Sequence, residues 1–283
     1  MHPAMKNSHG RPTDIPLGQA KLYILLDGAL MDALRYAYSS DTSPETEALY
    51  RDTRHDAALQ ISPLLIKPSP ESDFLSQQHL WRKNGIVLRS EASIAVLSQH
   101  LKSLISVRLP SQQMAYCRFY SPEWLVRFLT SLSDDELSAW SGPIQEWYAY
   151  SSQTWVGFQP SANKGGRKAV DEGWFCLRRE QIVQWQADEH QRFLRKAAAL
   201  LGRDVLSGSQ EADALSDIAE SVNAAHSHGF ILEYQCLHYL ELTHKFPQAF
   251  NSPEFTKVIR DLSQSADSRL QQAELLLFGL QEA

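Results

Sequence analysis

Four polar side chains occur at or near the ends of short apolar segments, and together they could support chemistry. Asp27 directly follows one apolar run, and Arg89 ends another. Arg118 and Tyr120 lie in a third. If these segments are neighbouring strands, the four groups could line the pocket of a small-molecule enzyme. They could equally form an ion pair that fixes strand register, or a polar rim that is presented to a partner.

A second group of candidates surrounds a polar loop at residues 159–173. The loop contains Lys164 and Arg167, but not the glycine and lysine spacing of a phosphate-binding loop. It is expected to be either a mobile solvent loop or a partner-binding loop. Arginine and aromatic side chains are typical anchors of protein interfaces, although flanking aromatics could equally belong to the core. The aromatic candidates on the two flanks are Trp155, Phe158 and Trp174.

The remaining motifs give no support for catalysis or for a metal. A Gly-x-Ser-x-Gly nucleophile elbow is absent. His226 and His228 are two residues apart, and on a helix such side chains point in nearly opposite directions, so they cannot share an ion. The sequence therefore predicts no catalytic residues, no metal ligands and no cofactor.

Composition narrows the class of protein. The net charge of −6 gives no overall electrostatic support for binding nucleic acid. No run approaches the ~18 apolar residues that a membrane span needs, and Met1–Pro16 lacks the apolar core of a secretory signal. The cysteines, Cys117, Cys176 and Cys236, are widely spaced, which indicates buried, reduced thiols. We expect a cytoplasmic protein without membrane insertion.

The elements that must position these residues indicate an α+β fold. Short apolar strands alternate with helical patterns up to about residue 150, and the pattern is almost wholly helical after residue 179. We expect an N-terminal α/β lobe with a small mixed sheet, followed by a mostly helical C-terminal lobe. The expected boundaries are a flexible leader at 1–19, the α/β lobe at 20–150, a hairpin-like connector with the basic loop at 151–180, and the helical lobe at 181–283.

The tripeptide Ser-Pro-Glu occurs four times. Serine caps a helix, proline suits the first helical position, and glutamate complements the helix dipole. Each copy is therefore predicted to mark or precede the start of a helix. The copies lie at 43–45, 69–71, 121–123 and 252–254.

The order of six short strings resembles the effector adaptor and chaperone family of type VI secretion, which was long catalogued as a domain of unknown function. The resemblance covers about Lys21 to Trp147, and a weaker similarity extends into the helical half. Ser121 stands where the family often has Asp, and both residues cap helices well. The strings are Leu25–Ala29, Ser62–Leu65, Gly85–Ser90, Val107–Pro110, Arg118–Pro122 and Gly142–Ile144.

The resemblance implies a cytosolic protein that is not an enzyme. Such a protein would bind one cognate type VI secretion effector and deliver it to the VgrG spike. The alternatives from other classes are the small-molecule enzyme with Asp27, Arg89, Arg118 and Tyr120 in its pocket, and a structural or regulatory protein that associates with itself.

Overall fold

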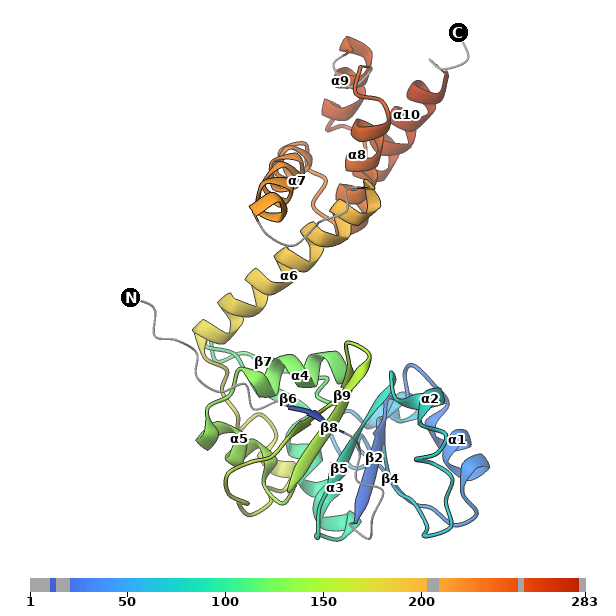
Figure 1. Ribbon diagram of the computed structural model, residues 1–283, viewed down its shortest axis with the longest axis vertical. Coiled ribbons are helices and arrows are strands. Elements are labelled where there is room, and N and C mark those ends of the chain that lie inside the picture. The colour runs from blue at the N-terminus through green and yellow to red at the C-terminus, as the bar shows by residue number, and fades with distance from the viewer. Residues whose placement is uncertain (1–10, 14–20, 203–208, 249–251, 280–283) are drawn as a thin grey trace. The chain divides into compact units, whose positions relative to one another are not determined.

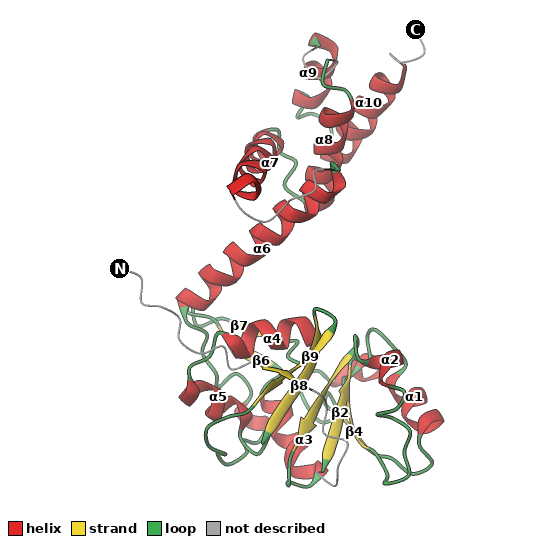
Figure 2. Cartoon of the chain, in the orientation of Figure 1, coloured by secondary structure: helices red, strands yellow, loops and turns green. Residues whose placement is uncertain are grey.

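The computed structural model describes residues 11–13, 21–202, 209–248 and 252–279, and the chain divides into two compact units (Figure 1). The first unit ends at Gln181 and the second begins at Ile182. Every described strand lies in the first unit, and the second is helical (Figure 2). The fold is thus α+β, as the sequence predicts. Of the expected leader, 1–10 and 14–19 lie outside the described residues.

The first unit is built on a seven-stranded sheet with the order β1-β9-β8-β5-β2-β4-β3. Every neighbouring pair in it is antiparallel, so the mixed sheet expected from the sequence is wrong. A separate hairpin of β6 and β7 forms around 109–113. The strands are β1 Arg11–Thr13, β2 Leu22–Leu26, β3 Glu45–Ala48, β4 Leu64–Lys67, β5 Gly85–Arg89, β6 Ser106–Arg108, β7 Met114–Tyr116, β8 Glu146–Ser151 and β9 Thr154–Phe158.

Helices cover the sheet on both faces. Ile24 of β2 packs in a cluster with Ala37 of α1 and Trp81 of α2, whereas its neighbour Leu25 points the other way and is equally buried. Burial on both faces explains why β2 is an unbroken apolar run. The helical segments of this unit are α1 Ala33–Ser40, η1 Asp56–Ile61, α2 Gln78–Trp81, α3 Ile94–Ser103, α4 Pro122–Thr130, α5 Asp134–Ser141 and η2 Ala169–Asp171.

The sheet continues past residue 150, where the α/β lobe was expected to end. A two-residue turn joins β8 to β9, and both its residues, Ser152 and Gln153, have positive φ. A hairpin of this kind normally carries Asn-Gly or a similar pair, so the sequence lacks the usual signal. Residues 174–177, in the second half of the expected hairpin-like connector, form an isolated bridge between Cys176 and Arg108 in place of a regular strand. Arg11–Thr13, placed in the expected flexible leader, forms the edge strand β1 beside β9.

Two of the four Ser-Pro-Glu copies do not begin helices. The copy at 43–45 leads into strand β3, and the copy at 69–71 lies in a loop. The buried Asp41 carboxylate accepts hydrogen bonds from the amides of Ser43 and Ser69, and so fastens both copies to one end of the β3–β4 pair. Burial by itself raises the pKa of Asp41, but these hydrogen bonds outweigh it and the pKa is lowered.

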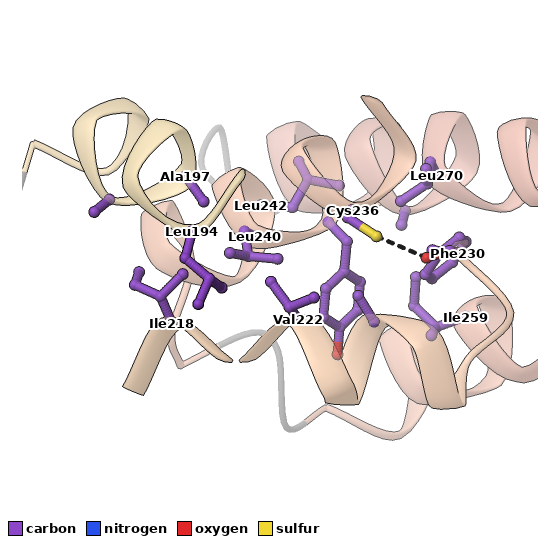
Figure 3. Packing of buried hydrophobic residues seen from close by; sticks show 14 of the residues in the cluster. Leu194, Ala197, Ile218, Val222, Phe230, Cys236, Leu240, Leu242, Ile259 and Leu270 are labelled. Carbon is purple, nitrogen blue, oxygen red and sulfur yellow. Dashed lines mark hydrogen bonds between the residues drawn. The ribbon is translucent and has the colours of Figure 1, made fainter. Parts of the chain in front are cut away.

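The second unit is a set of packed helices with its own apolar core, part of which Figure 3 shows. Leu194, Val222, Leu240 and Ile259 come from different helices and meet in this core. The buried Cys236 thiol donates to the Phe230 carbonyl oxygen. The helices are α6 Arg179–Leu200, which begins in the first unit, α7 Ser209–Ser227, α8 Glu233–Lys245, α9 Pro253–Arg260 and α10 Ala266–Gly279.

A buried arginine fastens two helix ends in this unit. One terminal nitrogen of Arg269 lies 2.8 Å from the His228 carbonyl oxygen and 2.5 Å from that of Ile259. These carbonyls follow α7 and close α9, where the helix dipoles favour a cation. The guanidinium also lies over the ring of Phe230. Arg269 therefore joins the α7–α8 loop to the end of α9.

Replacing Arg269 by Met should destabilise the second unit by roughly 2–4 kcal/mol, because two buried carbonyls lose a charged donor. Chemical unfolding, followed by circular dichroism and by tryptophan fluorescence, measures the loss. The exposed Lys257 on α9 provides a control, because Lys257→Met removes a charge without breaking a buried contact. Equal unfolding midpoints for the two variants would contradict the role of Arg269.

Candidate functional site

Asp27 and Arg118 form an ion pair at the end of β2. The Asp27 Oδ2 atom lies 2.8 Å from Nε and 2.5 Å from a terminal nitrogen of Arg118, and its Oδ1 accepts from the Ala29 amide at 2.9 Å. The carboxylate side chain is 1% exposed, whereas that of Arg118 is 41% exposed. The arginine thus neutralises a buried carboxylate while one side of it still contacts water.

The residue after Asp27 must be small. A Cβ atom on Gly28 would lie 2.2 Å from the Ser62 carbonyl oxygen, which is far inside van der Waals contact. This close approach packs the chain after β2 against the segment that leads into β4. The glycine of the Asp-Gly pair is therefore explained by backbone packing.

Tyr120 is not presented to solvent but belongs to a cluster of three tyrosines. Its hydroxyl lies 3.2 Å from that of Tyr50 and is also hydrogen-bonded to that of Tyr116. Tyr50 and Tyr116 are bonded to each other as well. Burial, and then the hydrogen bonds among the hydroxyls, raise the pKa of Tyr120. A phenol with a raised pKa stays protonated, so Tyr120 is unsuited to act as a base.

A network that the sequence does not reveal adjoins the tyrosines. The Glu172 Oε1 atom lies 2.9 Å from the ring of His55, 3.0 Å from Arg54 and 2.5 Å from the Ser106 hydroxyl. The His55 ring also contacts Tyr116 edge to face. Charged and polar partners more than 50 residues apart in sequence meet here, and no local spacing could have indicated it. The network fastens the 169–174 segment to the turn after β3.

Arg89 lies away from the Asp27–Arg118 pair. Strands β2 and β5 are antiparallel, with Leu22 opposite Arg89, so Arg89 and Asp27 stand at opposite ends of the two strands. Arg89 instead pairs with Glu146 of β8, at 2.8 Å between nitrogen and oxygen. The convergence of all four strand-end residues would require parallel neighbours, and the structure does not bring them together.

Two of the aromatic candidates belong to the core. Trp155 and Phe158 of β9 are buried, and the Trp155 indole nitrogen donates to the Gln78 side-chain oxygen at 2.6 Å. The Trp155 ring also packs against Trp81. Since both side chains are enclosed in the first unit, neither is available to contact a partner in this conformation.

The basic loop is exposed, and a buried histidine, His100, accepts a hydrogen bond from its backbone. Lys164 and Arg167 are exposed, and the Arg167 guanidinium lies 3.9 Å from the centre of the Trp174 ring, which is partly buried. The Arg167 amide donates to Nδ1 of His100 at 3.1 Å, while Nε2 of His100 donates to the Trp140 carbonyl oxygen. Burial lowers the pKa of His100 to about 4, so its ring is neutral. The loop is therefore held in place by the fold.

The structure also contains a groove, lined by both apolar and polar residues, that no local sequence pattern indicates. It encloses about 1110 Å³ beside β3, and one of its walls is the segment Gly28–Leu34. Leu30 and Leu34 in that wall are 57% and 54% exposed, and Tyr38 lies one turn further along α1 at 58%. The spacing of Leu30, Leu34 and Tyr38 by four residues could have indicated a shared apolar face. The same spacing is equally typical of a helix face that packs into the core, so it does not predict exposure.

The second unit exposes apolar side chains where two loops meet. Ile231 lies between α7 and α8 and Leu262 lies between α9 and α10, and they are 72% and 77% exposed. Arg269 bonds to a carbonyl in or beside each loop and holds the two loops together. Leu232 beside Ile231 is about half exposed. Single exposed apolar residues are common, but exposed apolar residues on two loops that one arginine joins are candidates for a contact surface.

Within the described ranges, no three His, Cys, Asp or Glu side chains are grouped as metal ligands. Nor does any described helix combine the length and apolar character that crossing a bilayer requires. Cys117 and Cys236 are buried as expected, but Cys176 is exposed. The candidate polar groups, Asp27 with Arg118, Arg89 with Glu146 and the tyrosines, are bonded to each other.

The Asp27–Arg118 pair predicts unequal effects for its two members. Arg118→Met should cost about 3 kcal/mol of unfolding free energy, because it leaves a carboxylate buried without its cation. Asp27→Asn should cost only about 1 kcal/mol, because the half-exposed Arg118 can turn to water and Asn retains the bond from Ala29. Denaturant titrations of both variants measure the difference. Equal losses would show that burial of the carboxylate does not set the strength of the pair.

His100 predicts a loss of stability in acid. Its pKa is about 4 in the folded chain, below the 6.5 of an unperturbed imidazole, so the unfolded chain binds the proton more readily. Stability owed to neutral His100 is complete above pH 6.5 and falls as the pH drops toward 4, by roughly 3 kcal/mol in all. His100→Gln should lose stability at pH 7.5 but decline less between pH 7.5 and 4.5.

The matched control for His100 is the exposed His190 on α6. His190→Gln should keep the acid decline of the original chain, because it leaves His100 and its buried contacts in place. Urea unfolding at the two pH values gives the comparison. A decline in His100→Gln as large as that in His190→Gln would contradict the assignment.

Comparison with known proteins finds a family match for one segment of the first unit. Residues 22–139, from the start of β2 into α5, match the family model described as Domain of unknown function (DUF4123). No curated protein and no solved structure matches the chain. The matched segment includes the Asp27–Arg118 pair, the tyrosine cluster and the groove, and in this segment the chain is similar to the DUF4123 family.

Proposed function

We propose that this protein is a non-catalytic adaptor that binds a cognate type VI secretion effector and delivers it to the VgrG spike. The match to the DUF4123 family and the ordered strings in the same segment support the family from which this role is inferred. The adaptor would act in the cytoplasm and bind each partner through its folded surface.

The observation that carries the proposal is that two compact units each combine a core with an exposed apolar surface. The first unit exposes Leu30, Leu34 and Tyr38, and the second exposes Ile231 and Leu262. An adaptor must hold cargo and carrier at the same time, and separate surfaces on separate units meet that requirement. Apolar anchors surrounded by polar residues supply most of the binding energy in protein interfaces.

The state of the strand-end polar groups supports the same conclusion. A catalytic acid or base needs a proton that it can exchange near neutral pH and access to a substrate. Asp27 is buried against Arg118, and Tyr120 is buried with a raised pKa. Arg89 pairs with Glu146 at the opposite end of the neighbouring strand β5. We therefore assign these residues to the scaffold and not to a small-molecule pocket.

Co-expression tests the proposal directly. The tagged chain is produced together with the effector and spike proteins encoded beside it, and affinity-purified material is passed over a sizing column with light scattering. We expect a complex that contains all three proteins, because the two exposed surfaces are separate. Recovery of the tagged chain alone, while both candidates are soluble, would contradict the adaptor function.

A paired variant tests whether the second unit serves one partner. The double variant Ile231→Asp with Leu262→Asp should lower the affinity for one of the two partners at least tenfold, about 1.4 kcal/mol. The other partner should remain bound. The control is Leu275→Asp, which alters an equally exposed apolar side chain on α10. If neither partner is weakened relative to that control, the second unit does not bind through these loops.

A further inference from the structure

The groove beside β3 adjoins an edge strand. Among the described residues, β3 is the last strand of the sheet and pairs with β4 alone. Three consecutive residues of β3, Thr46, Glu47 and Ala48, line the groove, and so does Leu64, which lies opposite Ala48 on β4. The groove therefore covers the end of the sheet face beside α1 and reaches the outermost strand, whose outer backbone groups have no strand partner in the described part of the chain.

The opposite wall offers apolar contacts. Leu30 and Leu34 project from the β2–α1 turn and from α1 and are more than half exposed, and Leu59 comes from η1. A backbone edge on one side and apolar side chains on the other are what an added strand requires. The groove encloses about 1110 Å³, which is room enough for a short peptide segment.

Charge distinguishes between a second copy of the chain and a different partner. Two β3 edges paired antiparallel would place Glu45 and Glu47 of one copy against those of the other, and like charges directly opposite are destabilising. The groove itself is lined by two carboxylates, of Asp32 and Glu47, and by one guanidinium, of Arg51. Among the described residues, Glu47 has no ion-pair partner. A basic segment would therefore fit better than a second copy.

We propose that this groove binds an extended segment of the cargo protein, which adds to the sheet as a strand beside β3. The segment alternates apolar with basic side chains, so that the apolar ones contact Leu30 and Leu34 and a basic one pairs with Glu47. The identity of the occupant as cargo rests on the adaptor function proposed above. The groove and its preference for an extended basic strand do not.

The probe is a fluorescent, end-blocked hexapeptide of the sequence Val-Lys-Val-Lys-Val-Lys, titrated against the full chain by anisotropy. We expect saturable binding with a dissociation constant below about 1 mM, or −4.1 kcal/mol. Hydrogen exchange of the segment 45–48 should slow when the peptide is bound. A peptide with Pro at its central Val, which removes a backbone donor, and a peptide with Glu at each Lys should both bind at least tenfold more weakly.

Two variants of the chain locate the site. Leu34→Asp removes an exposed apolar contact, and Glu47→Lys reverses the charge, and each should weaken the Val-Lys peptide about tenfold or more. The matched control is Val96→Asp, on the exposed side of α3, which should bind the peptide as the original chain does. Unchanged binding by both groove variants, absence of saturable binding, or unchanged exchange at 45–48 would each overturn the proposal.

The two proposals can fail separately. If the chain captures effector and spike but does not bind the peptide, the groove inference fails and the adaptor function stands. If the peptide binds at the groove while neither protein is captured, the strand-accepting groove stands and its assignment to the cargo fails.

Discussion

The ion pair between Asp27 and Arg118 fixes the path of the chain at one end of the sheet in the first unit. It connects the end of the interior strand β2 with the segment that leads from β7 into α4, 91 residues further along. An almost fully buried carboxylate would oppose folding if it were not paired, so the pair fixes where the chain after β2 must lie. Gly28 packs against β4 beside it, and the wall of the groove begins there. The chain around Gly28 therefore belongs both to the packing beside the ion pair and to the wall of the groove.

This constraint is one example of how the polar residues of the first unit are used within the fold. The charges and hydroxyls at the strand ends hold together segments that are distant in sequence, as Glu172 does with His55 and Arg54. Exposed apolar side chains lie beside β3, at Leu30 and Leu34, and on loops of the second unit, at Ile231 and Leu262. If the protein is the adaptor proposed above, partner exchange at these side chains would leave the ion pairs of the scaffold intact.

The sequence predicts those parts of the fold that have a local physical signal. Strand β2 is a continuous apolar run, and Ser252 caps α9 through its hydroxyl as its tripeptide indicates. The missed parts have no such signal. Ser152 and Gln153 adopt positive φ without glycine, so the β8–β9 hairpin was invisible. The placement of Arg89 depends on strand direction, which a single chain does not encode locally. For the candidate site, an ion pair between strand-end residues was one of the alternatives that the sequence left open. The groove could not be predicted, because its walls come from three segments that are separated in sequence and meet only in the fold.

The most direct test of this account is the affinity of the double variant Asp27→Asn with Arg118→Met for the effector encoded beside the chain. The variant removes both charges and leaves no buried ion, so it should fold, which circular dichroism verifies. If the pair serves the scaffold and binding occurs at the apolar surfaces, calorimetry should give an affinity within about twofold of the original chain. A folded double variant that loses tenfold or more would place the strand-end charges in the binding site and contradict the account.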